Sequence, residues 1–326
     1  MPPIDVLFVV LPHTLLLDLA GPAETLRLAN QQLARRGQPP AFALRFVGPQ
    51  REVMSSIGLG LGPIEPLPEA PFPHPTWVLL MGRPGEAKEV LQRDRKSWLH
   101  TRDWLARTLA PVLHAPRHGH RLLTVCSGAL LAADAGLLAG RQVTTHHEQL
   151  DDLARMAPTA RVLANRVFVD DGAVSSSAGI TAGIDLALDG VARVCGEAIA
   201  QAVARVMVVF SRRGSEAPEL SPLLAFRDHL HAGLHRVQDA VAEQPAEDWT
   251  LARLAELAAV TPRHLGRLFL DQLGTTPRDY VERVRLTIAE QALARGASRQ
   301  AAAEVAGFRS PRQLREALVR SGAVAQ

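Results

Sequence analysis

The stretch "LLTVCSGALLAADAGLL", residues 122–138, places one cysteine between two local patterns. The apolar residues before Cys126 predict a buried strand, and the leucine- and alanine-rich residues after it predict a helix over 127–137. Small residues at 127, 128 and 129 permit a sharp turn between the two. A strand, a tight turn and a helix in this order form a nucleophile elbow. Cys126 is then a nucleophile, a residue that lines a ligand pocket, or a small side chain that fills the turn.

The same two patterns alternate over the first 210 residues. We expect helices at Ala20–Arg36, 97–115, 184–196 and 197–209, and strands at 4–10, 42–47, 76–81, 121–126, 141–145, 161–164, 166–171 and 173–177. This alternation predicts an α/β fold in which a parallel sheet is covered by helices on both faces.

The composition changes after residue 210. The stretch "SRRGSEAPELSP", residues 211–222, is polar with one glycine and two prolines and is typical of a linker. Beyond it the strand pattern disappears and only helical periodicity remains. We therefore expect two domains, an α/β domain over 1–210 and an all-α domain over 223–326.

The all-α domain opens with a helix-turn-helix pattern, "LARLAELAAVTPRHLGRLFLDQLG" (251–274). Thr261 is an expected N-cap, and a proline at the first helical position suits the start of the second helix. Arg263, His264 and Arg267 then face outward near the start of that helix. This is where a recognition helix meets base edges in the major groove.

A second such unit reads "SRQAAAEVAGFRSPRQLREALVRSG" (298–322), with Ser310 as the expected N-cap. Arg312, Gln313 and Arg315 or Glu316 face outward. Between the two units, residues 276–296 predict a long helix that spans roughly 27 Å. That length places two recognition helices near the ~34 Å separation of successive major grooves.

The best-matching segments of this half, 251–293 and "AAEVAGFRSPRQL", resemble the DNA-binding domain of AraC-type regulators. The resemblance implies DNA binding through both recognition helices. Two features depart from the family pattern. Leu314 and Leu318 stand where aromatic residues are usual, and the chain ends "RSGAVAQ" in place of the usual closing turn.

The first half resembles the DJ-1/PfpI superfamily, a class I glutamine amidotransferase-like group. More narrowly it is similar to the GlxA group, which joins this fold to an AraC-type domain. The segments that carry the resemblance are the elbow stretch and its continuation to "TTHHEQL", "LLLDLAGPAETLRLAN" (15–30) and "SSSAGITAGIDLAL" (175–188). It implies a flavodoxin-like sandwich with a pocket at the carboxyl ends of the strands.

Carried over residue by residue, the resemblance makes Cys126, Asp18 and His146 the candidate catalytic residues. It places a ligand pocket at Asp18, Gly82, Arg83, Cys126, Ser127 and Gly179. Each has a structural alternative: Asp18 as a helix N-cap, His146 as a capping or surface residue, and Arg83 as a solvated loop residue rather than a partner of an anionic ligand.

Two departures from the family pattern argue against a catalytic role for Cys126. Arg83 stands in place of the second glycine of an oxyanion site, and Ser127 follows the cysteine where protease-like members carry histidine.

Composition narrows the function class. The net charge of the chain is +3, but the residues from Trp249 onward include twelve arginines and only seven acidic residues. This excess of positive charge favours a polyanionic partner.

Two cysteines, Cys126 and Cys195, suggest no disulfide framework, so a reducing cytoplasm is the expected setting. Cys195 lies on an apolar helix face and is expected to be a core residue. We expect no signal peptide, membrane span, cofactor or metal. The histidines at 114, 118, 120, 229, 231 and 235 lack a tetrahedral spacing signature.

The sequence thus predicts a transcriptional regulator that binds promoter DNA, senses a small-molecule effector and forms a homodimer, without enzymatic activity. The alternative is a DJ-1/PfpI-type enzyme, isonitrile hydratase-like or amidase-like, that uses Cys126.

Overall fold

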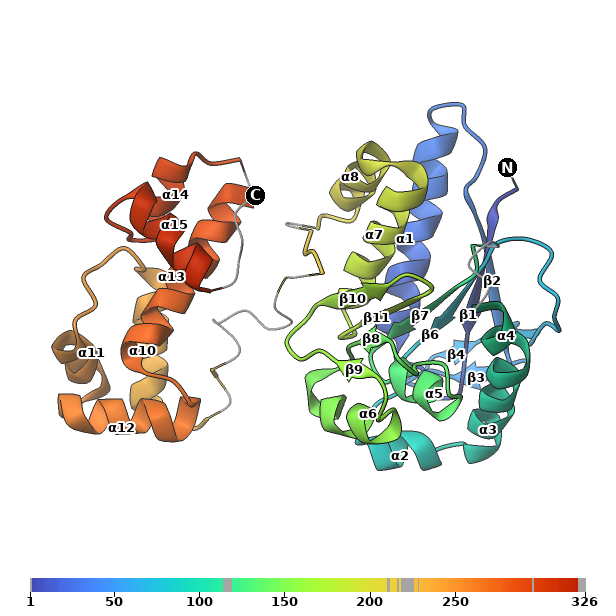
Figure 1. Cartoon of the computed structure of the whole chain (residues 1–326), viewed down its shortest axis with the longest axis horizontal. Helices are drawn as coiled ribbons and strands as arrows, with labels where there is room; N and C mark the ends of the chain where they lie inside the picture. The colour runs from blue at the N-terminus through green and yellow to red at the C-terminus, as the bar shows by residue number, and fades with distance from the viewer. Residues whose placement is uncertain are drawn as a thin grey trace. The chain divides into compact units, whose positions relative to one another are not determined.

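The computed structural model describes residues 2–113, 119–209, 212–215, 217, 226–227, 229–294 and 296–321. Its chain divides into two compact units, Met1–Glu219 and Leu220–Gln326, which are described separately below (Figure 1). Much of the expected linker at 211–222 lies outside the described residues.

The first unit is built on a seven-stranded sheet. Its spatial order is β10 (Phe168–Asp171), β11 (Val174–Ser177), β7 (Arg121–Val125), β6 (Thr76–Leu80), β1 (Ile4–Val9), β2 (Phe42–Gly48) and β5 (Glu65–Pro66). Every neighbouring pair is parallel except β10 with β11. The expectation of an all-parallel sheet is therefore wrong at this edge. Asp171 pairs with Val174 across a two-residue turn in which Gly172 has φ +69°, and such a tight hairpin requires antiparallel strands.

Four shorter strands stand outside this sheet. Residues expected as strands at 141–145 and 161–164 form a separate parallel pair, β8 (Gln142–Val143) with β9 (Arg161–Val162). An antiparallel hairpin that the sequence pattern did not indicate pairs β3 (Val53–Met54) with β4 (Gly60–Leu61).

Helices cover both faces of the sheet, as expected (Figure 1). Side chains alternate along β1, so Phe8 packs with one helical layer and Leu7 with the other. Cys195 packs half-buried against the first of these cores. One layer consists of three helices, α1 (Leu16–Ala34), α7 (Ala182–Cys195) and α8 (Glu197–Val206). The other layer consists of shorter helices: α2 (Ala87–Gln92), α3 (Arg95–Trp104), the π-helix η1 (Leu105–Leu109), α4 (Ala110–Leu113), α5 (Gly128–Asp134) and α6 (Leu150–Met156). The 3-10 turn η3 (His147–Gln149) directly precedes α6.

Helix α1 begins four residues earlier than expected, at Leu16 rather than Ala20. In the structure Pro22 lies inside the helix, buried beneath α7. This earlier start carries Asp18 into the first turn of α1.

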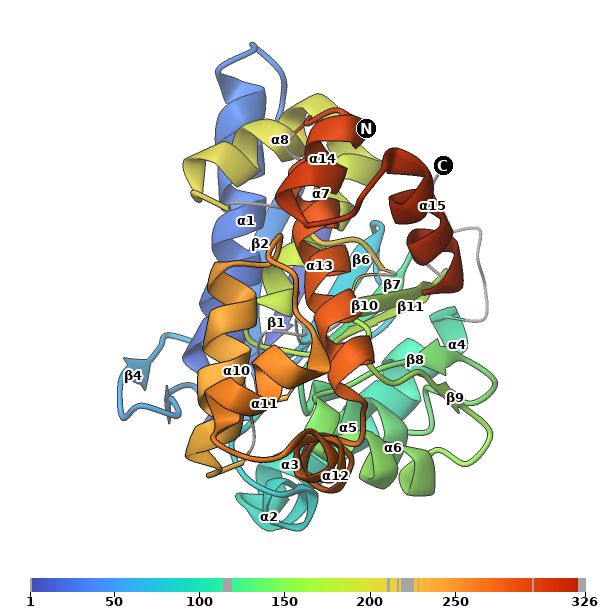
Figure 2. The same cartoon turned by 90° about the vertical axis from the view of Figure 1, so that its left-hand side faces the viewer.

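The second unit is all-α, as expected: α10 (Ala232–Glu243), α11 (Leu251–Ala258), α12 (Pro262–Leu273), α13 (Pro277–Ala294), α14 (Arg299–Val305) and α15 (Pro311–Arg320). Helix α13 is shared by two small cores, one with α10, α11 and α12 and one with α14 and α15 (Figure 2). Leu314 and Leu318, which replace the usual aromatic residues, are buried in the second core.

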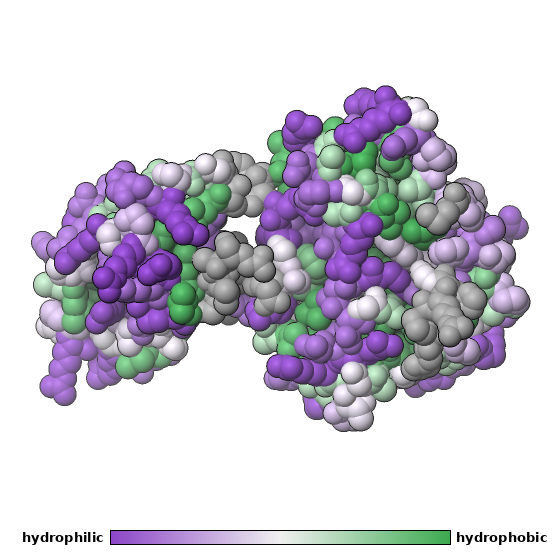
Figure 3. All heavy atoms as spheres, turned by 45° about the horizontal axis from the view of Figure 1, so that its top comes forward, coloured by the Kyte–Doolittle hydropathy of each residue, from purple (hydrophilic) through white to green (hydrophobic). Residues whose placement is uncertain are grey.

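Hydrophilic residues predominate on the face that Figure 3 shows. In the part of the chain that the structure describes, every helix is too short or too polar to cross a bilayer.

Candidate functional site

The elbow at Cys126 has the expected geometry. Strand β7 ends at Val125, and α5 begins at Gly128. Cys126 itself has φ +54°, a left-handed conformation that is uncommon for a residue other than glycine. Its backbone is held on both sides, because its N–H donates to Ser177 O (3.1 Å) and its carbonyl oxygen accepts from Thr145 Oγ1 (2.9 Å).

Two glycines press against the Cys126 side chain. A Cβ at position 82 would lie 2.7 Å from the Cβ of Cys126 and 3.1 Å from its Sγ. A Cβ at position 179 would lie 2.4 Å from the Cβ of Cys126 and 2.9 Å from its Sγ. The thiol is therefore enclosed, and Cys126 is 5% exposed.

Asp18 lies at the same place. Its Oδ2 accepts a hydrogen bond from Gly82 N (3.0 Å) and its Oδ1 accepts one from Ile180 N (2.8 Å). The alternative that Asp18 caps α1 is wrong, because the helix begins before it and its carboxylate bonds to two other loops. Burial raises the pKa of Asp18 to about 6, although both backbone hydrogen bonds oppose the shift.

Ser127 and Arg83 meet through their backbones. Ser127 Oγ accepts from Arg83 N (2.7 Å) and donates to Arg83 O (3.0 Å), which joins the elbow to the loop after β6.

The Arg83 guanidinium extends beneath α2. It donates to Val90 O (3.2 Å) and Arg93 O and lies 3.9 Å from Asp94 Oδ2. Its side chain is only 1% exposed, and burial lowers its pKa to about 10. The alternative of a solvated loop arginine is wrong, because the side chain is buried. Two backbone carbonyls accept hydrogen bonds from its Nη atoms, whereas its buried Nε has no hydrogen-bond partner among the described residues. Contact of Arg83 with an anionic ligand stays a prediction.

His146 stands at the rim of the elbow, one residue after Thr145. Its side chain is about a quarter exposed, its ring lies 4.2 Å from the ring of His147, and its Nδ1 lies 3.5 Å from Glu148 Oε2. The structure therefore brings all six candidate pocket residues together as buried residues around the elbow, although the Arg83 guanidinium extends away beneath α2. The catalytic candidate His146 lies beside this cluster.

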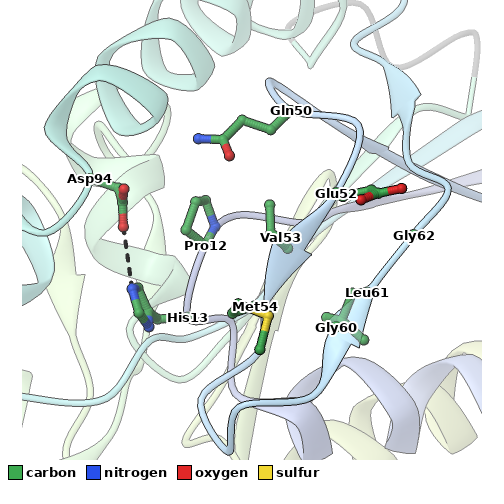
Figure 4. Close-up of a pocket in the computed structure, with 10 residues that line it drawn as sticks. All are labelled: Pro12, His13, Gln50, Glu52, Val53, Met54, Gly60, Leu61, Gly62 and Asp94. Carbon is green, nitrogen blue, oxygen red and sulfur yellow. Dashed lines mark ion pairs between the residues drawn. The ribbon is translucent and has the colours of Figure 1, made fainter.

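A hollow of about 550 Å³ opens next to this cluster, between the end of β1 and the β3–β4 hairpin (Figure 4). His13 and Asp94 lie next to one another at one side of it, with His13 Nε2 3.4 Å from Asp94 Oδ2. Two contacts connect the hollow to the elbow. Asp94, which lines the hollow, is the ion-pair partner of Arg83. Leu15, two residues after the lining residue His13, donates its N–H to Gly82 O (2.9 Å). The sequence motifs did not point to it, because its residues come from four separate segments.

Within the second unit, α12 presents the first predicted reading surface. Thr261 caps the helix by accepting from His264 N (3.3 Å), so this prediction is confirmed. Arg263, His264 and Arg267 are exposed, while Leu265 and Phe269 on the opposite face are buried. Among the described residues, no ion pair involves Arg263 or Arg267.

Helix α15 presents the second surface, and here the polar groups are already engaged. Ser310 caps the helix by accepting from Gln313 N (3.2 Å), as predicted. Gln313 Oε1 accepts from Arg309 N (2.8 Å), and Arg312 Nε lies 2.9 Å from Glu316 Oε1. Arg315 is exposed.

Four of the histidines weighed as metal ligands have structural contacts. One of them is His120, whose Nδ1 accepts from Thr76 N (3.1 Å). His231 caps α10 through Leu234 N, and His229 stacks on His235 with ring centroids 4.3 Å apart. His114 and His118 lie outside the described residues. No cluster of metal-ligating side chains occurs in the described ranges.

Known proteins match both units. Residues 106–193 match the DJ-1/PfpI family, and residues 254–321 match a helix-turn-helix domain. The chain is 29% identical to the HTH-type transcriptional regulator GlxA of Rhizobium meliloti, over 96% of this chain and 91% of that protein. It is also 29% identical to the HTH-type transcriptional regulator GbdR of Pseudomonas aeruginosa, over 88% of this chain and 72% of that protein.

Among solved structures, a THiJ/PfpI family protein from Pseudomonas syringae aligns with a TM-score of 0.52 and 21% identity. The alignment covers 79% of this chain and 91% of that one. This likeness confirms the flavodoxin-like α/β fold expected for the first unit.

Proposed function

Because this chain belongs to the proteins that join a DJ-1/PfpI domain to an AraC-type helix-turn-helix domain, we propose that it is a DNA-binding transcriptional regulator whose DJ-1/PfpI domain senses a small metabolite. The observation that carries the proposal is the exposed start of α12, where Arg263 and Arg267 stand beside a confirmed N-cap. An exposed guanidinium at this position of a recognition helix reads guanine in the major groove.

The second recognition helix supports DNA binding in a different way. Helix α13 has 18 residues and packs with both helix-turn-helix units, which fixes the spacing between α12 and α15. On α15, Arg312 and Gln313 are already paired within the helix and its cap. We propose that α12 supplies most of the base reading and that α15 mainly contacts phosphates.

Sensing is proposed for the elbow and the hollow together. Cys126, Asp18 and Gly82 are buried, so a metabolite reaches them by displacing the 179–181 loop or acts on them from the hollow. The hollow has two carboxylates on its walls, from Glu52 and Asp94. These favour a metabolite with an ammonium group or another hydrogen-bond donor.

Binding of the full chain to its own upstream DNA tests the regulator. We expect preference for that fragment over random DNA, with affinity that falls steeply as salt rises because each phosphate contact adds about 0.9 to the log–log slope. Equal affinity for both fragments at moderate ionic strength would overturn the proposal. The expected homodimer is checked by sedimentation of the same sample.

Catalysis by Cys126 is the second candidate, favoured by its left-handed backbone and by the neighbouring Asp18. Cys126→Ser separates the two functions. Loss of turnover of an isonitrile or an amide, with DNA binding intact, would establish an enzyme. Loss of a metabolite's effect on DNA binding, without turnover in the wild type, would establish a sensor.

A further inference from the structure

The chain that leaves the first unit is fastened to it. Arg212 pairs with Glu197 of α8, and Ala217 O accepts a hydrogen bond from Val167 N (3.0 Å). Between these two contacts, Arg213 binds the start of α7. Residues 212–215 and 217, here called the strap, therefore pack on the first unit instead of leaving it directly. The chain continues beyond them into the second unit.

Arg213 makes the most extensive of these contacts. Its Nε and Nη2 donate to Asp185 Oδ2 at 2.9 and 2.7 Å, and its backbone N–H donates to Asp185 Oδ1 (3.0 Å). Nη2 also donates to Thr181 Oγ1 (2.9 Å). Asp185 is 5% exposed, so its charge depends on this partner.

The loop that leads directly into this first turn of α7 closes the elbow. Gly179 touches Cys126, Ile180 N donates to Asp18, and Ala182 N donates to Gly179 O (2.9 Å). The segment 179–185 therefore contacts the elbow through its first residues and binds Arg213 through Thr181 and Asp185.

This turn is packed too tightly to move without its neighbours. A Cβ at Gly183 would lie 3.0 Å from Val125 Cγ1, at the end of β7. A Cβ at Gly21 would lie 2.8 Å from Ile184 Cγ1. With α1 and β7 pressed against the first turn of α7, a shift at the elbow displaces the turn as a unit, since close-packed interiors have few alternative arrangements.

We propose that the Arg213–Asp185 pair is the switch through which the state of the elbow reaches the DNA-binding unit. A metabolite that displaces the 179–181 loop moves Asp185 and Thr181, weakens their hold on Arg213 and releases the strap. The proposal rests on the proposed function, because it describes how that sensor signals. Coupling of this kind is reciprocal, so loss of the strap contact must also loosen the elbow.

Hydrogen–deuterium exchange of the full chain tests this reciprocity without DNA or metabolite. In Arg213→Ala we expect amide exchange across residues 179–185 to rise at least tenfold, with no change in β7. In Asp18→Asn, which disturbs the Ile180 contact, we expect exchange of the Arg213 amide to rise. Arg212→Ala is the matched control, because it removes the same charge from the neighbouring position but leaves Asp185 paired.

Unchanged exchange across 179–185 in Arg213→Ala, or an equal rise in Arg212→Ala, would overturn the switch. If Arg213→Ala loosens β7 as well, Asp185→Asn replaces it. Asp185→Asn breaks the same pair without leaving an unpaired carboxylate at the buried position 185. Unchanged exchange across 179–185 in this variant, or an equal rise in Arg212→Ala, would again overturn the switch.

Binding to the upstream DNA separates this inference from the proposed function. In the wild-type background we expect Asp18→Asn to change the Kd for DNA about fivefold or more, and in the Arg213→Ala background we expect no further change. Equal effects in both backgrounds would overturn the switch while leaving the regulator intact. A wild type that does not prefer its upstream fragment would overturn the regulator, and the exchange experiment would still decide whether the elbow and the strap are coupled.

Discussion

Gly179 and Cys126 are in direct contact, since a Cβ on residue 179 would lie 2.4 Å from the Cβ of Cys126. Gly179 also has φ +104°, where other residues are strained. We therefore expect Gly179→Ala to lower the free energy of unfolding of the first unit by about 2–4 kcal/mol. The measurement is urea unfolding followed by tryptophan fluorescence. In a Cys195→Ser background, a thiol reagent should also modify Cys126 faster.

Gly37→Ala is the control for this substitution. Gly37 has φ +68°, but a Cβ there meets no atom within 4 Å. It therefore carries only the backbone penalty, about 1 kcal/mol. Equal losses in the two variants would show that the contact with Cys126 contributes nothing.

The pH dependence of stability reports on Asp18. Burial raises its pKa from 3.8 to about 6, so between these values the folded state binds a proton that the unfolded state releases. The contribution of Asp18 to the free energy of unfolding thus falls as pH rises from about 4 to about 6, by about 3 kcal/mol in total, and is constant above that range.

Asp18→Asn removes this contribution, since the amide does not titrate. The difference in unfolding free energy between the wild type and the variant should therefore change with pH between about 4 and 6 and level off above it. A difference that stays constant over this range would show that Asp18 titrates at its ordinary value.

Arg267 is expected to read a base. Replacement by alanine should weaken binding to the upstream fragment by about 1–3 kcal/mol and should affect random DNA much less. Fluorescence anisotropy with both fragments measures this difference. Arg155→Ala removes an exposed arginine from the first unit and should leave both affinities unchanged. Equal losses on the two fragments would assign Arg267 to phosphate contact.

Arg312 is expected to contribute less than Arg267, because its pair with Glu316 must be broken before it contacts DNA. Hydrogen bonding to Arg312 lowers the pKa of Glu316, so the carboxylate is charged at neutral pH. Glu316→Gln should therefore raise affinity for random DNA and steepen its salt slope by up to about 0.9. An unchanged slope in Glu316→Gln would show that Arg312 does not approach the phosphates.

Local sequence patterns predicted most of the elements and their chemistry. The apolar run before Cys126 specified β7, and Thr261 and Ser310 specified where α12 and α15 begin. Each of these features depends on hydrogen bonds or periodicity within a few residues, which the sequence shows directly. The resemblance to a family then placed Asp18, Gly82 and Gly179 near the cysteine.

By itself, then, the sequence determined two units, an α/β sheet and paired helix-turn-helix motifs, since backbone preference and hydrophobic spacing act along the chain. Only the tertiary structure decided that Arg83 turns beneath α2, that His13 and Asp94 border a hollow, and that Arg213 binds Asp185. Each of these contacts joins segments that are distant in sequence. The partner that a buried charge finds depends on how the helices and strands pack, and no local pattern records that packing.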